Sequence, residues 1–283
     1  MTFLRQNVTA CFLQDLKRIA PLALERPSVL EWAVLTLAIA NQKGGVAKTN
    51  LTGNLGAELA ARGQRIVLVD LDPQATLTTW LLGRTNAPGT AEILLGEEEA
   101  GSVLIDVPAF GLALIAAVPD RLRIAERTLS AQVASERTLR KALRRLEADV
   151  VLIDCPPSMG VLTASALVAA TTGVIIPLAA APEALDGYVQ VTANLQRLRD
   201  ALDLPIPIVA VVPTRFDHRL RIARDVLEAA RSLCNGTLTS PIRENVALRE
   251  LFGHRQPIRN YRPESTGAAD YAAVATEVLQ RAQ

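Results

Sequence analysis

A glycine-containing string between an apolar run and a helix-like stretch constrains the fold of this chain more than any other feature. Residues 42–49 read Gln-Lys-Gly-Gly-Val-Ala-Lys-Thr. The apolar run at residues 34–40 is typical of a buried strand, and leucines recur every fourth residue within 48–62, as on one helix face. A loop in this position points backbone N–H groups at an anion, and the helix N-terminus adds partial positive charge. The string therefore predicts a phosphate-binding loop in an α/β fold.

The side chains of this loop fit the same chemistry. Lys48 is expected to reach the β- and γ-phosphates of a nucleotide, and the Thr49 hydroxyl to ligate Mg²⁺. Gly44 and Gly45 let the backbone approach the phosphates without a Cβ in the way.

The loop nevertheless departs from the ordinary phosphate-loop pattern, G-x-x-x-x-G-K-[ST]. The two glycine positions of that pattern hold Gln42 and Ala47. An alanine is tolerated there if it already lies in the first turn of the helix, so we expect Ala47 to have a negative φ.

The rest of the chain after residue 33 alternates strand-like and helix-like segments. Such alternation predicts βαβ units, and hence a doubly wound, mainly parallel sheet flanked by helices. We expect residues 1–33 to form a peripheral or poorly ordered N-terminal extension, in which 11–20 could form one short helix, and residues 34–283 to form a single domain. Further strands are expected at 65–70, 112–118, 150–154, 173–177 and 206–212, and helices at 137–146, 185–202 and 220–233.

Composition narrows the functional classes. The net charge is +1 and aromatic residues are 4% of the chain, so no strong overall field favours nucleic acid or membrane, and the core must be mostly aliphatic. No apolar run is long enough for a membrane span, and the three cysteines lack ligand spacing, which favours a cytoplasmic protein. The acidic stretch at 92–106 is more typical of a solvated surface than of a site.

A second string carries carboxylates at the end of the next strand. Residues 69–75 read Val-Asp-Leu-Asp-Pro-Gln-Ala. A carboxylate there can hold Mg²⁺ or orient an attacking water, and Asp72 is the candidate, with Asp70 in support. The alternative is that both aspartates cap the following helix.

A third string, Val150-Val-Leu-Ile-Asp-Cys-Pro-Pro-Ser158, is an apolar strand that ends in an aspartate. The carboxyl ends of parallel strands meet at one edge of the sheet. Asp154 is therefore expected near the Mg²⁺ that Thr49 and Asp72 would also approach.

With its second lysine, Lys43, the loop resembles the deviant Walker A family, K-G-G-x-x-K-[ST], which includes ParA, MinD, the nitrogenase iron protein and arsenite-pump ATPases. The resemblance implies a Mg²⁺-dependent ATPase that binds ATP or ADP. It also implies that Lys43 reaches the phosphates of the partner subunit in an ATP-sandwiched homodimer. The catalytic set would then be Lys43, Lys48 and Asp72, with Val46, Ala47 and Asn50 completing the nucleotide-binding loop.

The C-terminal part is similar to ParA in particular. Residues 242–248, Ile-Arg-Glu-Asn-Val-Ala-Leu, together with 257–258 and 262–271, match the pattern I-P-R-N-V-R-L … P-I … P-x-S-x-G-A-x-x-Y, with Arg243 at the first proline position. The match implies that Arg243 and Asn245 border the adenine. Thr214, in the string 212–217 at the end of another strand, is expected to line the same pocket.

The same resemblance implies sequence-independent binding of double-stranded DNA. Residues 197–262 hold twelve arginines and seven acids. Arg219 matches one arginine that the family uses for DNA, whereas the other position holds Ala247. The candidate DNA contacts are Arg219, Arg221, Arg224 and Arg249.

Together these features indicate a nucleoid-associated ATPase switch for chromosome or plasmid partition, released from DNA when a ParB-like centromere-binding protein stimulates hydrolysis. The alternative is a positioning ATPase similar to MinD, acting on a membrane or a protein cargo. That role needs a basic amphipathic C-terminal helix with bulky apolar anchors, and the tail at 272–283 has no Phe or Trp. A cluster-carrying iron protein would need interface cysteines, which Cys155 alone does not supply.

Overall fold

A computed structural model describes residues 34–181 and 183–283 of the chain. The expected N-terminal extension and its helix at 11–20 lie outside the described residues. Within the described part, residues from Val34 onward form one compact unit.

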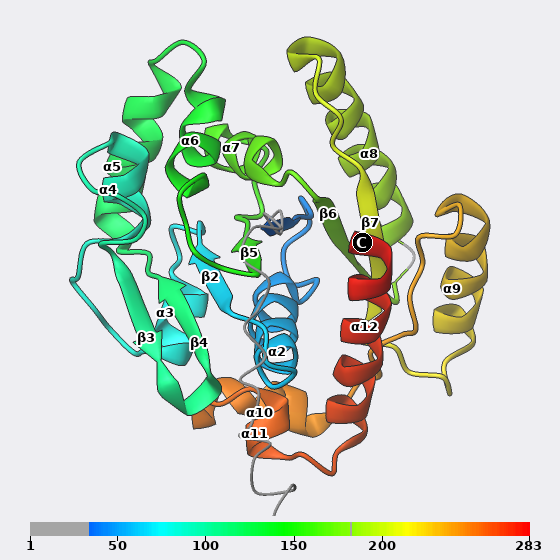
Figure 1. Ribbon diagram of the computed structural model, residues 1–283. Coiled ribbons are helices and arrows are strands. Elements are labelled where there is room, and N and C mark those ends of the chain that lie inside the picture. The colour runs from blue at the N-terminus through cyan, green and yellow to red at the C-terminus, as the bar shows by residue number, and fades with distance from the viewer. Residues whose placement is uncertain (1–33, 182) are drawn as a thin grey trace, which may run out of the picture. The chain divides into compact units, whose positions relative to one another are not determined.

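The unit is built on a seven-stranded sheet with the order β3-β4-β2-β5-β1-β6-β7 (Figure 1). All neighbouring strands are parallel except β3 and β4, which pair antiparallel at one edge. The doubly wound, mainly parallel sheet expected from the sequence is therefore confirmed. The strands are β1 (Leu35–Ile39), β2 (Ile66–Asp70), β3 (Leu104–Val107), β4 (Leu112–Ile115), β5 (Val150–Asp154), β6 (Gly173–Ala179) and β7 (Ile208–Thr214).

Eleven α-helices in the described residues connect and cover these strands. The longest, α8 and α12, span Glu183–Leu202 and Thr266–Ala282. The others are α2 (Lys48–Ala60), α3 (Thr76–Leu81), α4 (Thr90–Leu95), α5 (Pro119–Ser130), α6 (Thr138–Leu143), α7 (Val161–Ala169), α9 (Arg221–Leu233), α10 (Val246–His254) and α11 (Ile258–Tyr261).

Two apolar layers, one on each face of the sheet, form the core. Successive strand residues point to opposite faces, so Leu37 and Ile39 of β1 pack with α2 and α12, whereas Ala38 packs with α5, α7 and α8. Strands buried on both faces read as continuous apolar runs, which is why the sequence pattern located them.

The sequence did not predict β3, α3–α5, α7 or α10–α12. The strand β3 has only four residues and a half-exposed side-chain pattern, because it forms the edge of the sheet; it begins within the acidic stretch. Within that stretch the side chains of residues 97–99 are exposed, as expected, but Glu92 accepts a hydrogen bond from the Gly89 N–H at the start of α4.

The C-terminal helix α12 is part of the core. Tyr271, Val274 and Val278 are almost fully buried, and α12 packs against α2 and β7. The apolar face that a membrane anchor would need is thus already covered by the protein. Among the described residues, no helix is long and apolar enough to cross a membrane.

The contact between α2 and α3 depends on a residue without a side chain. A Cβ placed on Gly53 of α2 would lie 2.3 Å from Cζ3 of Trp80 in α3. Trp80 itself is almost fully buried, its indole N–H donates to the Leu251 carbonyl at 3.1 Å, and its ring lies 4.7 Å from that of Phe252. The indole therefore cannot move aside without breaking other contacts.

We therefore expect Gly53→Ala to lower the free energy of unfolding by about 1–3 kcal/mol, the usual cost of overpacking a core. Gly253→Ala is the matched control, because its added Cβ meets nothing within 4 Å. In the helix α10, that substitution should raise stability by about 0.5–1 kcal/mol. Urea unfolding followed by circular dichroism measures both changes, and equal effects of the two substitutions would contradict this packing account.

Candidate functional site

The phosphate-binding loop connects β1 to α2 at the carboxyl edge of the sheet. A Cβ added at Gly44 or Gly45 would meet no atom within 4 Å, so open space lies above both glycines. Gly45 has a φ of +74°, which favours glycine. Backbone N–H groups of the loop and of the first turn of α2 therefore face a space that an anion can enter.

The expectation for Ala47 was wrong. Ala47 is not inside the first helical turn with a negative φ; it precedes α2 with φ 67° and ψ 32°, in the left-handed region. Its carbonyl accepts the first helical hydrogen bond, from the Leu51 N–H at 2.9 Å. The chain enters the helix through a tight turn that needs this conformation, and a residue other than glycine there costs about 1–3 kcal/mol.

Lys48 is buried in the loop with only 7% of its surface exposed. Its ammonium lies 3.3 Å from the Lys43 carbonyl oxygen. Burial lowers the pKa of Lys48, and the nearby Asp154, Cys155 and Asp72 oppose that shift. A buried ammonium of this kind is stabilised by an anion placed within reach of it.

Asp154 lies fully buried at the end of β5, beside Asp70 at the end of β2. One carboxylate oxygen of Asp154 lies 3.2 Å from the Thr52 hydroxyl, and the other, Oδ2, has no hydrogen-bond partner among the described residues. Burial, and next the charge of Asp70, raise the pKa of Asp154 to about 8, whereas the Thr49 hydroxyl opposes the shift. A buried carboxylate oxygen without a partner calls for a cation or a proton.

These oxygens suit Mg²⁺. Among the described residues no three His, Cys, Asp or Glu side chains gather closely enough to form a metal cage. Mg²⁺ commonly uses one or two protein carboxylates and takes its remaining ligands from waters and substrate phosphates. Thr49, Asp72 and Asp154 would hold the ion next to the phosphates.

The two aspartates of the second string differ in role. Asp70 accepts hydrogen bonds from both the backbone N–H and the hydroxyl of Thr78, at 2.8 and 2.7 Å, in the first turn of α3. Helix capping, the alternative considered for both residues, thus describes Asp70. Asp72 accepts from the Gln74 N–H at 2.9 Å and borders the cavity described next.

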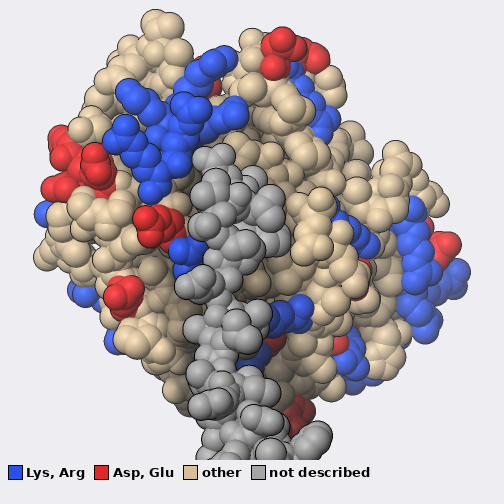
Figure 2. All heavy atoms as spheres, viewed as in Figure 1, with Lys and Arg blue, Asp and Glu red and all other residues tan. Residues whose placement is uncertain are grey.

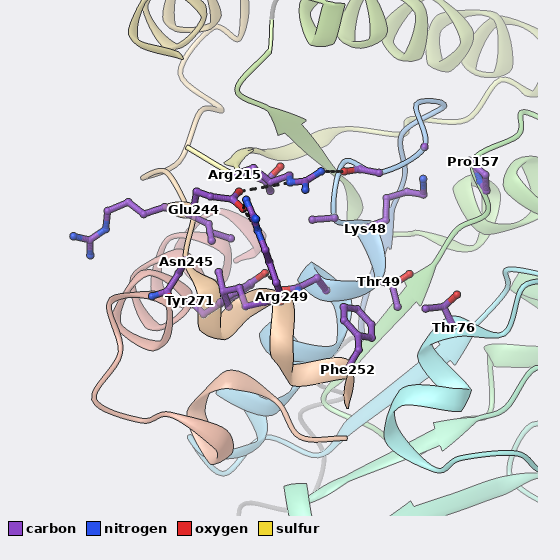
Figure 3. A pocket seen from close by; sticks show the side chains of 18 of the residues that line it. Lys48, Thr49, Thr76, Pro157, Arg215, Glu244, Asn245, Arg249, Phe252 and Tyr271 are labelled. Atoms are coloured by element: carbon purple, nitrogen blue, oxygen red, sulfur yellow. Dashed lines mark hydrogen bonds and ion pairs between the residues drawn. The ribbon is translucent and has the colours of Figure 1, made fainter. Parts of the chain in front are cut away.

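A cavity of about 380 Å³ opens beside the loop, within the range of small-molecule sites (Figure 3). One wall comes from the loop, α2 and the segment after β2, and the other from the segment after β7 and from α10 and α12. The lining residues are Gly44, Gly45, Ala47, Lys48, Thr49, Asn50, Asp72, Thr76, Pro157, Thr214, Arg215, Ile242, Arg243, Glu244, Asn245, Leu248, Arg249, Phe252 and Tyr271.

Two predicted loop residues are not part of this lining. Val46 has its side chain buried, with 1% exposed, so only its backbone can serve a ligand. Lys43 lies outside the cavity, its ammonium 3.5 Å from the Glu183 carboxylate at the start of α8. The Lys43 side chain borders a different, shallow hollow with Gln42, Met159 and Gln190.

On the cavity wall that includes α10 and α12, other residues of the protein hold the side chains of Arg243 and Asn245. Arg243 forms a bidentate ion pair with Asp270, the shortest contact being 2.6 Å. Asn245 caps α10 by accepting from the Ala247 N–H at 2.9 Å, and its amide donates to the Thr266 hydroxyl. Both line the cavity, so they shape its wall while their polar groups are already partnered.

Two side chains at the end of β7 hold the loop itself. The Thr214 hydroxyl donates to the Val46 carbonyl at 3.1 Å, and Arg215 donates to the Gly45 carbonyl at 3.1 Å. Arg215 also lies 3.6 Å from Glu244, which in turn accepts from Arg249 at 2.6 Å (Figure 3). The sequence placed Thr214 in the pocket but singled out neither Arg215 nor Glu244. Their only signal was a position next to predicted residues.

The candidate DNA arginines do not lie together. Arg249 lines the cavity, whereas the others lie at or before the start of α9. Arg219 is paired with Asp217 at 2.7 Å, and Arg221 lies 3.7 Å from Asp225. Arg224 instead donates to the His218 carbonyl at 3.4 Å.

Residues 34–208 match a family described as an AAA domain. The chain is 37% identical over 256 residues to the chromosome-partitioning ATPase Soj of Thermus thermophilus, covering 90% of this chain and 99% of that protein. It is 36% identical over 252 residues to the chromosome partitioning protein ParA of Caulobacter vibrioides, covering 87% and 94%.

A solved structure is similar as well. Cobyrinic acid a,c-diamide synthase from Mycobacterium smegmatis, with a bound ATP analogue and magnesium, is 34% identical to this chain. The match covers 87% of this chain and 95% of that one, with a TM-score of 0.74.

The raised pKa of Asp154 predicts how stability depends on pH. The folded state holds this proton more tightly than the unfolded state, where the pKa is near 3.8. The resulting contribution to stability is complete below about pH 4 and is lost as pH rises toward about 8. In the nucleotide-free protein with chelator, the stability of wild type should therefore fall relative to that of Asp154→Asn between pH 6 and 8.

Urea unfolding at several pH values measures this difference. Asp106→Asn is the matched control, because it makes the same substitution at an exposed position. If the free energy of unfolding changed with pH equally in wild type and Asp154→Asn, Asp154 would not hold its proton in this range.

Proposed function

The chain belongs to the ParA/Soj family of partition ATPases, and from this premise we propose that it acts as an ATP-dependent dimerising switch in the segregation of a chromosome or plasmid. It is a P-loop ATPase whose nucleotides are ATP and ADP, with Mg²⁺ as the cofactor. The observation that carries the switch proposal is the division of the two loop lysines. Lys48 lies inside the cavity, whereas Lys43 lies outside it.

Within one subunit the cavity binds the nucleotide and positions its terminal phosphate for attack by water. The Lys48 ammonium neutralises phosphate charge, and the N–H groups at the start of α2 bind phosphate oxygens. Mg²⁺ supplies further charge neutralisation at the phosphates when bound. Asp72, which lines the same cavity as the loop glycines, orients the attacking water.

Between subunits, Lys43 supplies the charge. Its side chain is 39% exposed and its partner Glu183 is 71% exposed, so the ion pair between them is weak and easily exchanged. A triphosphate presented by a second subunit is a stronger partner for the ammonium than one exposed carboxylate. ATP therefore favours the dimer, and hydrolysis, which removes the terminal phosphate, weakens it.

This switch controls binding of the protein to the DNA backbone. Arg219, Arg221 and Arg224 lie on the surface near the start of α9. Phosphate contacts of this kind carry no sequence information, so the dimer binds DNA of any sequence and associates with the nucleoid. A ParB-like partner that stimulates hydrolysis would release it.

Lys43→Ala tests whether Lys43 acts between subunits while Lys48 acts within its own. Nucleotide binding by the monomer should survive, because this side chain lies outside the cavity, while ATP-dependent dimerisation and turnover should fall. Lys48→Ala is the comparison variant, which should lose nucleotide binding itself by at least about 10-fold, the size of one hydrogen bond to a charged group.

Binding of a fluorescent ATP analogue and sedimentation with a nonhydrolysable analogue separate the two effects. A Lys43→Ala protein that dimerises as wild type does would remove the role proposed for this lysine between subunits.

Asp72→Ala tests the switch as a whole. Turnover should fall by roughly 100-fold, because the water is no longer oriented. Nucleotide binding should persist, so the ATP-bound dimer and its DNA complex should accumulate. Phosphate release measures turnover, and fluorescence anisotropy on random duplex with ATP, ADP or no nucleotide measures DNA binding. Equal DNA affinity in all three states would contradict the proposed switch, and wild-type turnover would contradict the role of Asp72.

A further inference from the structure

A second basic surface lies on α5 and α6, away from the arginines discussed so far. Residues 121–145 contain eight basic and two acidic side chains. Figure 2 shows Lys and Arg side chains gathered over this part of the molecule. We call the central residues the α5–α6 patch: Arg127, Arg137, Arg140, Lys141 and Arg144.

Helical geometry places most of these charges on one side. Positions 137, 140, 141 and 144 follow the spacing i, i+3, i+4 and i+7, which brings side chains to one face of a helix. Leu139 and Leu143 point the other way and are buried against the core. Within the part of the chain that the structure describes, the short helix α6 thus has its apolar side buried and its basic side without an acidic partner.

No acid within the described residues forms an ion pair with a member of the patch. None of its five members has a carboxylate within 4 Å among the described residues, although Arg121, Arg123 and Arg145 nearby do. On α9 and just before it, by contrast, Arg219, Arg221 and Arg231 are each paired with an acid. The α5–α6 patch therefore has more unpaired positive charge than the surface that the sequence indicated.

The two surfaces lie at different places on the sheet. The helix α5 follows β4, near one edge of the sheet, whereas α9 follows β7 at the opposite edge. Figure 1 shows α5 and α6 on one side of the unit and α9 on the other. The patch is therefore not an extension of the α9 arginines.

The patch adjoins the loop that carries Asp72. Pro73, the next residue, borders a surface hollow together with Arg123, Glu126, Arg127 and Ser130 of α5. An anion bound over α5 therefore lies beside a segment of the nucleotide site.

We propose that the α5–α6 patch is a second binding surface for the phosphate backbone of duplex DNA. Like charges one turn apart on a helix repel one another, and a polyanion removes that repulsion while releasing its own counterions. Four of the five members are arginines, whose planar forks match phosphate oxygens. Insertion into a membrane surface is less compatible with α6, because it requires an exposed apolar face and the leucines of α6 are buried.

The proposal rests on the proposed function for the identity of the polyanion, and the test separates the two. The variant is Lys141→Gln/Arg144→Gln. The matched control, Arg84→Gln/Arg197→Gln, removes the same charge from exposed positions outside both basic surfaces. Anisotropy on random duplex is recorded across a salt series with a nonhydrolysable ATP analogue, and thermal unfolding confirms that each variant folds.

We expect the plot of log affinity against log salt to lose about two units of slope in the patch variant, one for each lost phosphate contact, and none in the control. A Lys141→Gln/Arg144→Gln protein with wild-type slope would overturn the patch, and if Arg219→Gln/Arg224→Gln still lost slope, the proposed function would stand without it. Absence of duplex binding by wild type would overturn both. Patch-dependent binding to vesicles containing phosphatidylserine, with an unchanged duplex slope, would reassign the patch to a lipid surface.

Discussion

The burial of two groups that can carry opposite charges, at the carboxyl edge of a parallel sheet, is the constraint on which this structure depends. Lys48 and Asp154 are both nearly excluded from solvent, yet Lys48 lacks a carboxylate within ion-pair distance among the described residues, and one oxygen of Asp154 has no hydrogen-bond partner there. Removing such charges from water is unfavourable unless each gains a partner. The fold therefore leaves Lys48 without an anion and Asp154 without a cation. A nucleotide supplies the anion, and its metal ion supplies the cation.

The cavity beside the phosphate-binding loop is assembled from segments far apart in the chain. One wall follows from the order β1, loop, α2, which is local in sequence. The other is built by residues 214–215 and 242–252, and it is held in place by ion pairs such as Arg243 with Asp270. Asn50 connects the two walls, because its amide donates to the Leu248 carbonyl and its side-chain oxygen accepts from Tyr271. A change in either wall can therefore be transmitted to the start of α2.

Much of this could be predicted from the sequence, because the determining patterns are local. Buried parallel strands are continuous apolar runs, and a strand–loop–helix order places a phosphate loop without knowledge of the rest of the fold. What could not be predicted depends on tertiary context. The left-handed conformation of Ala47 follows from the angle at which the chain enters α2, and the capping role of Asp70 depends on where α3 begins. Counting arginines and acids in the sequence also does not show which of them pair in the folded protein. The arginines near α9 are largely paired with acids, whereas those of the α5–α6 patch have no such partner among the described residues.

The two hydrogen bonds from β7 to the phosphate loop have a consequence for the thermodynamics of binding. Thr214 and Arg215 fix the carbonyls of Val46 and Gly45, so the peptide planes of the loop are oriented before a ligand arrives. Ordering a mobile backbone costs about 1–2 kcal/mol per residue. In this protein that conformational entropy is lost during folding, and association with a nucleotide does not have to supply it again. Preorganisation of this kind makes the entropy of binding less unfavourable, and it leaves only a small heat of loop ordering in the measured binding enthalpy.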